Sequence, residues 1–341
     1  MSLKIMQVSD LEHFRDLLDE RKQALAEWLN SAASVRRDDI KNVQLLLTQI
    51  KDALDRVDNL SYGDCSICHG EIELHRLEVQ PARRVCLDCI TDDEKTALEE
   101  DLYLASKIHR ALLPQAIPEI GGFEVGVRTR AARDIGGDYF DFLPDANGLR
   151  SRVVIGDAMG KGMPAGLLMS NLQGALRILS SEVGSPSSLM TRLNQWLCRN
   201  VPITKFVSLL CVSLEPASDS ETRLVYANAG HCPPILMRSE GSVERLEATG
   251  GVLGVHEGFT YEERSVALFP GDILTLYTDG ITEMVNTRGE MFEEERLIQF
   301  LSRHRTDSTE AIVDKLIEEA LDFSGNSQAD DDLTVIVLLK R

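Results

Sequence analysis

Apolar residues in the first sixty positions recur at alternating steps of three and four, in two separate runs. The first run covers residues 11–32 and is interrupted at Arg21, and the second covers residues 40–57 without a break. This spacing places apolar side chains along one face of a helix and is the heptad pattern of coiled coils. The short polar segment SVRRDD between the runs favours an antiparallel helical hairpin over residues 1–61. Two amphipathic helices packed separately on the rest of the protein would produce the same pattern.

A third helical pattern covers residues 94–113, and its apolar stripe ends before Pro114. The stripe consists of Leu98, Leu102, Ala105, Ile108 and Leu112.

From about residue 121 the pattern changes to short runs of Val, Ile, Leu and Tyr bounded by Gly, Pro, Asn or Asp. Several connections are too short for a parallel crossover, so we expect largely antiparallel sheets with helices packed outside. Ser185 with Pro186, and Asp307 with Glu310, resemble helix starts. The predicted strands are 123–128, 138–143, 152–156, 206–214, 222–228, 233–237, 265–268, 272–278 and 333–339, and the predicted helices are 164–182, 186–200, 293–304 and 308–323.

Composition narrows the possible partners and the compartment. The chain has 341 residues and a net charge of −19, which argues against general binding to DNA or to anionic membranes. No run approaches the roughly 20 apolar residues that cross a bilayer, and the N-terminus lacks the apolar core of a signal peptide. We therefore predict a cytoplasmic protein.

Four of the seven cysteines form two close pairs, Cys65 with Cys68 and Cys86 with Cys89. Each pair can present two sulfurs from one tight turn, and four thiolates close a tetrahedron around zinc. A closed tetrahedron leaves no position for water, so the predicted zinc site is structural. A redox-active dithiol is the alternative interpretation.

Four predicted strands begin or end with aspartate. Asp157 and Asp279 end strands, whereas Asp138 and the run of three aspartates at residues 330–332 begin them. Neighbouring antiparallel strands bring an end beside a start, so four carboxylates can meet at one edge. Such a cluster repels itself unless hard divalent cations such as Mg²⁺ or Mn²⁺ neutralise it. Acids and glycines at strand ends are also ordinary turn residues.

Six motifs in order over residues 100–341 resemble the SpoIIE/RsbU-like branch of the PPM-type metal-dependent protein phosphatases. They are RDIGGDYFDF, IGDAMGKGMPAG, ANAGHCPPIL, GVLGV, LYTDGITEMVN and DDLTVIVLL. The resemblance implies an α-β-β-α sandwich over residues 119–341, which hydrolyses phosphoserine or phosphothreonine on a protein with two Mn²⁺ or Mg²⁺ ions. By family analogy, a plausible substrate is an anti-sigma factor antagonist.

The same resemblance assigns roles to individual residues. It implies metal ligands at Asp138, Asp157, Asp279 and Asp331, together with the backbone carbonyl of Ala158. Asp141 is a candidate to orient a ligand, and His231 is expected to shape a turn. Arg133 and Lys161 are candidates to bind the substrate phosphate. Met159 stands where some distant members carry a histidine that could protonate the leaving group, so the general acid is left open.

The cysteine segment, residues 62–92, resembles the zinc finger of the DksA/TraR family, with a central Arg-Leu and a proline before the second pair. The preceding hairpin strengthens the likeness, because that family's hairpin reaches into RNA polymerase. Here the hairpin is short and its tip, SVRRDD, is not clearly acidic. The finger also lacks a basic face for DNA.

These patterns predict a phosphatase controlled by its N-terminal module, with residues 93–118 as a connecting helix that carries the signal and forms a homodimer by analogy with the family. One alternative is a transcription regulator that binds RNA polymerase through the hairpin and finger, with a weakly active or silent phosphatase-like domain. Another is a partner-binding scaffold controlled by zinc or thiol oxidation.

Overall fold

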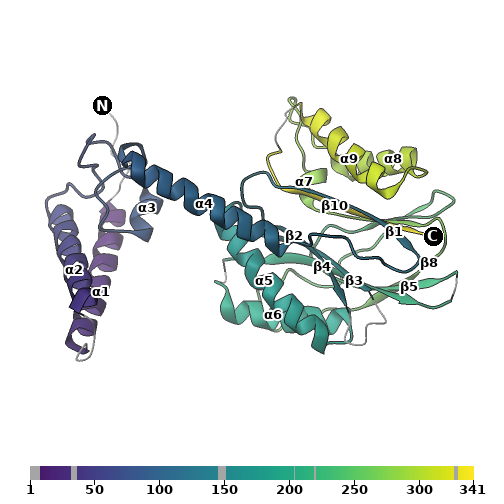
Figure 1. Ribbon diagram of the computed structural model, residues 1–341, viewed down its shortest axis with the longest axis horizontal. Helices are drawn as coiled ribbons and strands as arrows, with labels where there is room; N and C mark the ends of the chain where they lie inside the picture. The colour runs from purple at the N-terminus through teal and green to yellow at the C-terminus, as the bar shows by residue number, and fades with distance from the viewer. Residues whose placement is uncertain (1–7, 32–36, 145–150, 203, 219, 326–328) are drawn as a thin grey trace. The chain divides into compact units, whose positions relative to one another are not determined.

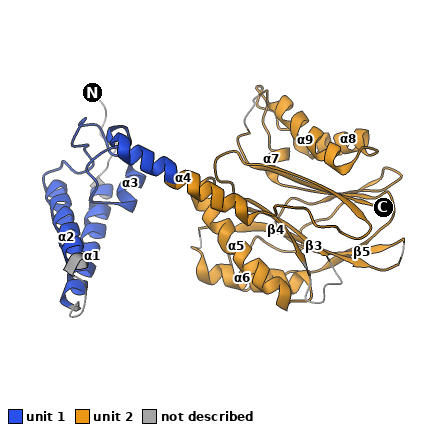
Figure 2. Cartoon of the chain, in the orientation of Figure 1, with its two compact units in different colours: residues 1–100 blue, residues 101–341 orange. Residues whose placement is uncertain are grey.

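The computed structural model describes residues 8–31, 37–144, 151–202, 204–218, 220–325 and 329–341. Its contacts divide the chain into two compact units, residues 1–100 and residues 101–341 (Figure 2). Within the described residues, no helix combines the length and the hydropathy that crossing a bilayer requires.

The first unit begins with two antiparallel helices, α1 (Val8–Ser31) and α2 (Arg37–Asp58). Phe14 and Leu18 of α1 pack with Ile50 and Leu54 of α2 in one apolar cluster, and Arg15 pairs with Asp58. The predicted hairpin is confirmed, and most of its connection lies outside the described residues. The heptad positions are not equally buried, because burial is greatest where the hairpin meets the cysteine segment.

The cysteine segment folds against the base of this hairpin. It contains helix α3 (Leu74–Val79) and the short 3₁₀ helix η1 (Leu87–Cys89). Tyr62 and Leu77 belong to the same apolar cluster as Phe14, and the Tyr62 hydroxyl donates to the Pro81 carbonyl at 2.7 Å. One small core therefore serves both the hairpin and the finger.

Helix α4 (Asp92–Leu112) agrees with the predicted helix to within two residues. Its start is stabilised by Thr91, whose hydroxyl accepts from the Glu94 N–H at 3.2 Å while Glu94 Oε2 accepts from the Thr91 N–H at 3.0 Å. This reciprocal pair satisfies two backbone donors that a helix start leaves open.

The second unit contains two five-stranded sheets (Figure 1). Every pairing within them is antiparallel, as the short connections predicted. In sheet order, the first has β1 (Phe123–Arg130), β10 (Leu333–Lys340), β9 (Ile273–Tyr277), β6 (Ile235–Met237) and β7 (Val243–Arg245), and the second has β2 (Asp138–Pro144), β3 (Ser151–Ala158), β4 (Val207–Pro216), β5 (Thr222–Ala229) and β8 (Arg264–Leu268).

Helices cover the outer face of each sheet and produce four layers. Strand β3 shows the arrangement, because Val153 and Ile155 enter the core between the sheets whereas Val154 faces the helical layer. Helices α5 (Met163–Glu182) and α6 (Pro186–Asn200) pack on that face, and α8 (Glu293–His304) and α9 (Thr309–Ser324) pack on the other sheet. The α-β-β-α sandwich is confirmed.

The helix starts were predicted with mixed success. Ser185 caps α6 and accepts from the Ser188 N–H, as expected. Helix α9 is instead capped by Ser308, which accepts from the Ala311 N–H at 3.3 Å. Asp307, the predicted cap, pairs with Lys315 at 2.8 Å.

The short elements β7 and α7 (Asp279–Thr282) were missed, because three or four residues carry too little periodicity to recognise.

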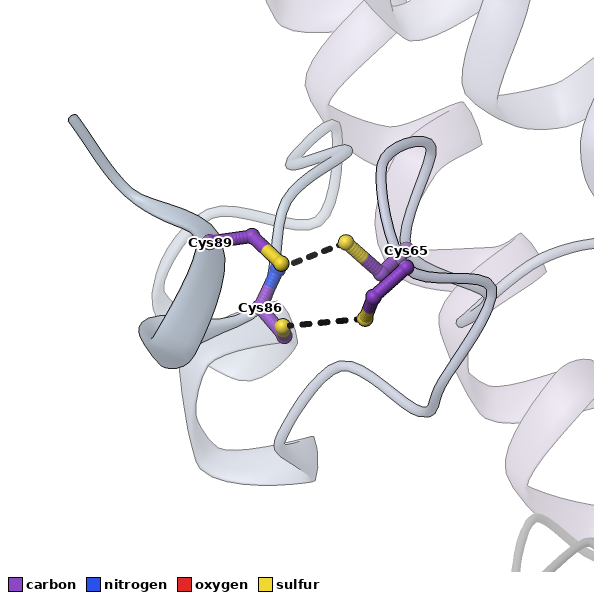
Figure 3. Close-up of side chains that lie close together, drawn as sticks. Cys65, Cys86 and Cys89 are labelled. Carbon is purple, nitrogen blue, oxygen red and sulfur yellow. Dashed lines mark hydrogen bonds between the residues drawn. The ribbon is translucent and has the colours of Figure 1, made fainter.

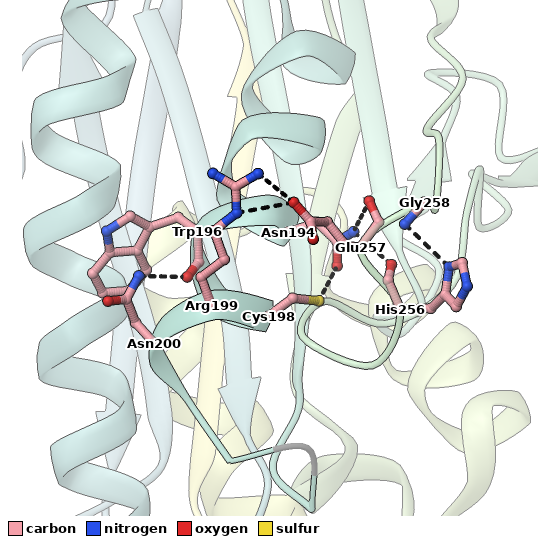
Figure 4. Close-up of polar contacts among 8 residues, drawn as sticks. All are labelled: Asn194, Trp196, Cys198, Arg199, Asn200, His256, Glu257 and Gly258. Carbon is pink, nitrogen blue, oxygen red and sulfur yellow. Dashed lines mark hydrogen bonds and ion pairs between the residues drawn. The ribbon is translucent and has the colours of Figure 1, made fainter.

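Helix α6 also holds the loop that follows residue 253 (Figure 4). The buried Asn194 side chain donates to the His256 carbonyl at 2.9 Å and accepts from the Gly254 N–H at 3.0 Å. Arg199 of the same helix pairs with Glu257. This loop contacts Val207 at the start of β4 through a backbone bridge at Leu253.

Candidate active site and zinc site

Each sheet contributes one strand start and one strand end to a cluster of acids. In the second sheet, β2 begins with Asp138 directly opposite Asp157 near the end of β3. In the first sheet, the Thr278 N–H after β9 donates to the Thr334 carbonyl in β10 at 3.0 Å. Asp279 and Asp331 flank this contact. The sequence predicted that the acids meet at one edge of a single sheet. In the structure they come from the same end of two stacked sheets.

Asp138 is held by hydroxyl groups from the opposite sheet. It is 6% exposed, and its Oδ2 accepts from Thr278 Oγ1 at 2.8 Å and from Thr334 Oγ1 at 2.7 Å. Burial, together with the charge of Asp157, raises the pKa of Asp138 well above its usual range, although the Thr334 hydroxyl opposes this shift. Sequence reasoning missed both threonines, although each stands within three residues of a predicted ligand.

Asp157 and Asp279 lie close enough to repel each other. Burial, and then the charges of Asp279 and Asp331, raise the pKa of Asp157 to about 7. Burial, and then the charges of Glu283 and Asp331, raise the pKa of Asp279. The structure therefore brings the four predicted acids into one electrostatic cluster, which a divalent cation would stabilise.

The neighbouring residues Asp331 and Asp332 have different partners. Asp331 is about half exposed, and its carboxylate pairs with Lys161 Nζ at 2.8 Å. Asp332 is 8% exposed and accepts from the Ala132 N–H at 2.7 Å and from the Gly137 N–H at 2.5 Å. Asp332 thus fastens the loop before β2, while Asp331 presents its carboxylate to the cluster.

Gly137 allows the Ala158 carbonyl to approach this loop. A Cβ atom at Gly137 would lie 2.8 Å from the Ala158 oxygen and 3.1 Å from Asp157 Oδ1. Any larger residue would push the acid cluster apart, because real Cβ contacts are longer than this. The close approach explains the second glycine of the RDIGGD motif.

One cation contacts the acid cluster, and two more lie beside the Gly160–Gly162 turn. Lys161 Nζ also donates to the Asp330 carbonyl at 2.7 Å. Arg133 lies beside the same loop, since a Cβ atom at Gly162 would be 3.8 Å from its Nη1. Lys205 is a third cation that sequence reasoning missed, and its Nζ would be 3.4 Å from a Cβ atom at Gly160.

Asp141 does not belong to the acid cluster. Asp141 stands three residues after Asp138 on β2, so its side chain is on the opposite face and points to the helical layer. There it accepts from the Tyr139 hydroxyl at 2.7 Å and pairs with Arg177 of α5 at 2.9 Å. The expectation that Asp141 orients a metal ligand is therefore wrong, because strand alternation directs its side chain to the opposite face of the sheet.

Two further residues near the motifs have mainly structural partners. Met159 is 38% exposed, and its N–H donates to the Phe206 carbonyl. His231 is buried, and its Nδ1 lies 2.9 Å from Ser208 Oγ. Burial lowers the pKa of His231 to about 4, so it is neutral at ordinary pH. Its backbone N–H donates to Asn228 Oδ1 at 2.8 Å, which agrees with the expected role in the turn.

The four paired cysteines gather in the first unit, and Figure 3 shows the sulfurs of Cys65, Cys86 and Cys89 facing one another. All four sulfurs lie within 4.8 Å of one another. Burial opposes ionisation of Cys65, but N–H donors from Cys68, Cys86 and Ile67 lower its pKa to about 6. Four sulfurs at this spacing fit a tetrahedral zinc ion. Among the described residues, no other group of three or more His, Cys, Asp or Glu side chains is this compact.

Two helix-covered sheets with clustered carboxylates at one end define a PP2C-type protein serine/threonine phosphatase. A family model described as "Stage II sporulation protein E (SpoIIE)" matches residues 147–340, which is more than half of the chain. The chain belongs to this family, as its motifs predicted.

Individual relatives agree with this assignment. Phosphoserine phosphatase RsbU of Bacillus subtilis (strain 168) is 27% identical over 245 residues, which cover 72% of this chain and 71% of RsbU. The solved SiaA-PP2C domain of Pseudomonas aeruginosa has a TM-score of 0.63 at 18% identity and covers 73% of this chain and 99% of that domain. At this identity the solved domain supports the fold alone.

The cysteine segment has its own match. A model described as "Prokaryotic dksA/traR C4-type zinc finger" matches residues 60–95. RNA polymerase-binding transcription factor DksA of Escherichia coli (strain K12) is 24% identical over 109 residues, which cover 25% of this chain and 72% of DksA. The predicted resemblance of the finger is confirmed.

Proposed function

We propose that residues 119–341 hydrolyse phosphoserine or phosphothreonine on a regulatory protein, under the control of the N-terminal hairpin and finger. The observation that carries this proposal is the convergence of acids from both sheets, with raised pKa values, at one end of the sandwich. The phosphoserine phosphatase RsbU supports the choice of substrate class. An anti-sigma factor antagonist is the substrate that we propose.

The donor set fits two Mn²⁺ or Mg²⁺ ions, because every candidate ligand is an oxygen atom. The residues that would hold the ions are Asp138, Asp157, Asp279 and Asp331, with the Ala158 carbonyl. Bound ions of this kind supply the Lewis acid that activates water and neutralises phosphoryl oxygens.

The surrounding side chains support this assignment through their contacts. Thr278 and Thr334 orient Asp138 by donating to one of its oxygens. Lys161 forms an ion pair with Asp331, and its ammonium group offsets part of the negative charge of the acid cluster. We propose that Lys161 and Arg133 turn toward the phosphoryl group when the substrate arrives, since both border the Gly160–Gly162 turn.

Contacts of α4 support a route for control. Within the second unit, Ser106 Oγ donates to the Asp134 carbonyl at 2.8 Å, and the buried His109 lies against the loop that carries Ile135 and Gly136. This loop continues into Gly137 and Asp138. A shift of α4 would therefore move the backbone that shapes the acid cluster.

The exposed apolar face of α4 supports a homodimer. Leu98, Leu102 and Ile108 of the predicted stripe are 46%, 45% and 56% exposed. Apolar side chains at heptad spacing bury themselves against a second helix of the same kind. We propose that residues 93–118 of two chains pair along this stripe.

Activity of the full chain tests the proposed catalysis. With Mn²⁺, the purified protein should hydrolyse p-nitrophenyl phosphate and a phosphoserine protein. Asp279→Asn should lower kcat by about 100-fold or more, because it removes a charged ligand while keeping the shape of the side chain. Asp314→Asn, which removes an exposed acid paired with Arg128, is the matched control. Hydrolysis by Asp279→Asn at the wild-type rate would reject the assignment.

A second candidate function rests on the finger and its likeness to DksA. We propose RNA polymerase binding through the hairpin as the alternative role of the first unit. A pull-down with purified polymerase tests it, and retention of polymerase by the full chain with no phosphatase activity would favour this alternative.

A further inference from the structure

The first unit contains a cleft of about 890 Å³ between the hairpin and the finger. Its walls come from the middle of α1, the middle of α2 and the segment 80–85 before the second cysteine pair, together with Ile90 and Glu94. A cleft of this size falls within the range of small-molecule sites in proteins. None of the four zinc ligands lines it.

Part of the cleft lining is apolar. Leu46 of α2 lines it while remaining 46% exposed, and Leu25 of α1 lies beside it. Ile50 and Ile90, which are 5% and 7% exposed, also line the cleft. The folded unit therefore leaves apolar side chains uncovered inside a concavity, where a ligand of suitable shape would bury them.

The charged part of the lining has more arginines than acids. Arg21, Arg83 and Arg84 line it, against two carboxylates, Asp52 and Glu94. Both acids already have partners, since Glu94 accepts from Thr91 and Asp52 pairs with Arg56 at 3.2 Å. This concentration of arginine is notable in a chain with a net charge of −19.

The two finger arginines are weakly satisfied. Arg84 has a 57% exposed side chain and reaches Asp52 only at 3.7 Å. Arg83 donates to the Gln80 side chain, yet its buried Nε has no hydrogen-bond partner. Burial, and then the charge of Arg76, lowers the pKa of Arg83. An anion in the cleft would relieve this repulsion and satisfy the open donors.

We propose that this cleft binds a small organic anion, whose acidic group is held by Arg83 and Arg84 and whose apolar body lies against Leu25 and Leu46. Guanidinium groups suit this role because they bind carboxylate, sulfonate or phosphate oxygens through two parallel N–H donors. The cleft would give the N-terminal unit a ligand-binding function that does not depend on the phosphatase site.

Fluorescence titration of the zinc-loaded full chain with 1-anilinonaphthalene-8-sulfonate tests the proposal, because this probe joins a sulfonate to an aromatic body. We expect saturable binding of one probe per chain. Arg84→Gln should weaken it by about tenfold or more, the scale of one charged hydrogen bond, and Leu46→Gln by about fivefold, the scale of burying the exposed part of a leucine side chain. Both side chains are exposed, so the variants should fold and retain zinc.

Two positions of α2 supply controls for the loss of a leucine and the loss of a cation. Leu45→Gln and Lys51→Gln change an exposed leucine and a cation of α2 that do not line the cleft, and both should leave the affinity within about twofold. Equal weakening by the controls, or unchanged binding by Arg84→Gln, would overturn the proposal. Displacement of the probe by inorganic pyrophosphate at equal concentration would also overturn it, because a bare anion would then suffice.

Discussion

The cysteine cluster and the aspartate cluster use ligand-type side chains in contrasting ways. Four sulfurs from a stretch of 25 residues, Cys65 to Cys89, converge within 4.8 Å. The acids come from both sheets and from positions as distant as Asp138 and Asp331, and they form a looser group. The Cys86 and Cys89 thiols stay neutral because their pKa values are raised, whereas carboxylates at close range repel one another. The compact cysteine cluster, which we call the closed cluster, thus suits a structural metal site. The looser aspartate cluster, which we call the open cluster, leaves room for a reaction.

The largest effect should follow from breaking the closed cluster. Cys65→Ser with Cys68→Ser should abolish zinc binding and unfold the first unit, because structural zinc contributes about 10–16 kcal/mol in small zinc domains. The core of Tyr62 and Leu77 that the finger shares with the hairpin would be lost with it. Zinc content and near-UV circular dichroism measure the change.

Cys198→Ser is the control for this variant, since Cys198 lies in α6, outside the cluster. It should retain the wild-type zinc content. The double variant should still hydrolyse p-nitrophenyl phosphate with Mn²⁺, because the second unit has its own core. A double variant that keeps one zinc per chain would show that the four cysteines are not the zinc site.

The next effect concerns the hydroxyl groups that hold the open cluster together. Thr278→Val with Thr334→Val should lower kcat by about tenfold or more, because each buried hydrogen bond to a charged group is worth about 1.5–3 kcal/mol. Loss of both donors should also raise the pKa of Asp138 further, since the Thr334 and Thr278 hydroxyls now lower it.

Thr275→Val, in β9 three residues before Thr278, is a matched control. Its buried hydroxyl has no hydrogen-bond partner among the described residues, so its removal should leave activity unchanged and stability equal or higher. Similar losses of activity in Thr275→Val and the double variant would mean that the sheet, and not the two hydroxyls on Asp138, limits the site.

The two clusters also differ in how far the sequence could predict them. The finger depends on local spacing, so its four ligands could be recognised directly. The acids required the assumption that strand ends meet, which the short connections between predicted strands and the phosphatase motifs supported. Thr278 and Thr334 could not be found in this way, because their role arises only when two sheets stack. Asp141 was misjudged because sequence proximity to Asp138 does not reveal the face of the strand.

Lys205 and the cap of α9 are two further contacts that the sequence could not predict. Lys205 reaches Gly160 across 45 positions of sequence, and no local pattern links the two. Asp307 and Ser308 are adjacent and chemically equivalent as caps, so backbone geometry alone decides that Ser308 accepts from Ala311. The elements and their chemistry were thus predictable, whereas contacts between layers were not.

A moderate effect on stability should come from competition between protons and Mn²⁺ for the acids of the open cluster. Because the pKa of Asp157 is raised from 3.8 to about 7, the metal-free protein should lose stability as pH rises between these values. Mn²⁺ should restore it, and the increase in Tm should be several degrees at pH 7.5 and less than half as large at pH 5.5. Thermal unfolding with and without Mn²⁺ measures both.

Asp157→Asn serves as the control for this titration. It removes the group that titrates, so its Mn²⁺-dependent increase in Tm should be small and should vary less with pH. A wild-type increase in Tm that is equal at both pH values would contradict the prediction, because protons would then not compete with the cation.

The smallest effect should come from Lys161, the one cation that pairs with a proposed ligand among the described contacts. Its bond to Asp331 joins two side chains that are each nearly half exposed, so solvent limits the pair to about 0.5–1 kcal/mol. Lys161→Gln should therefore lower the Mn²⁺ concentration for half-maximal activity by about twofold to fivefold, and raise KM for the phosphoprotein if Lys161 binds phosphate. Lys205→Gln, which removes a cation near Gly160, should leave the Mn²⁺ requirement unchanged. An increased Mn²⁺ requirement in Lys161→Gln would mean that Lys161 supports the carboxylates and does not compete with the cation.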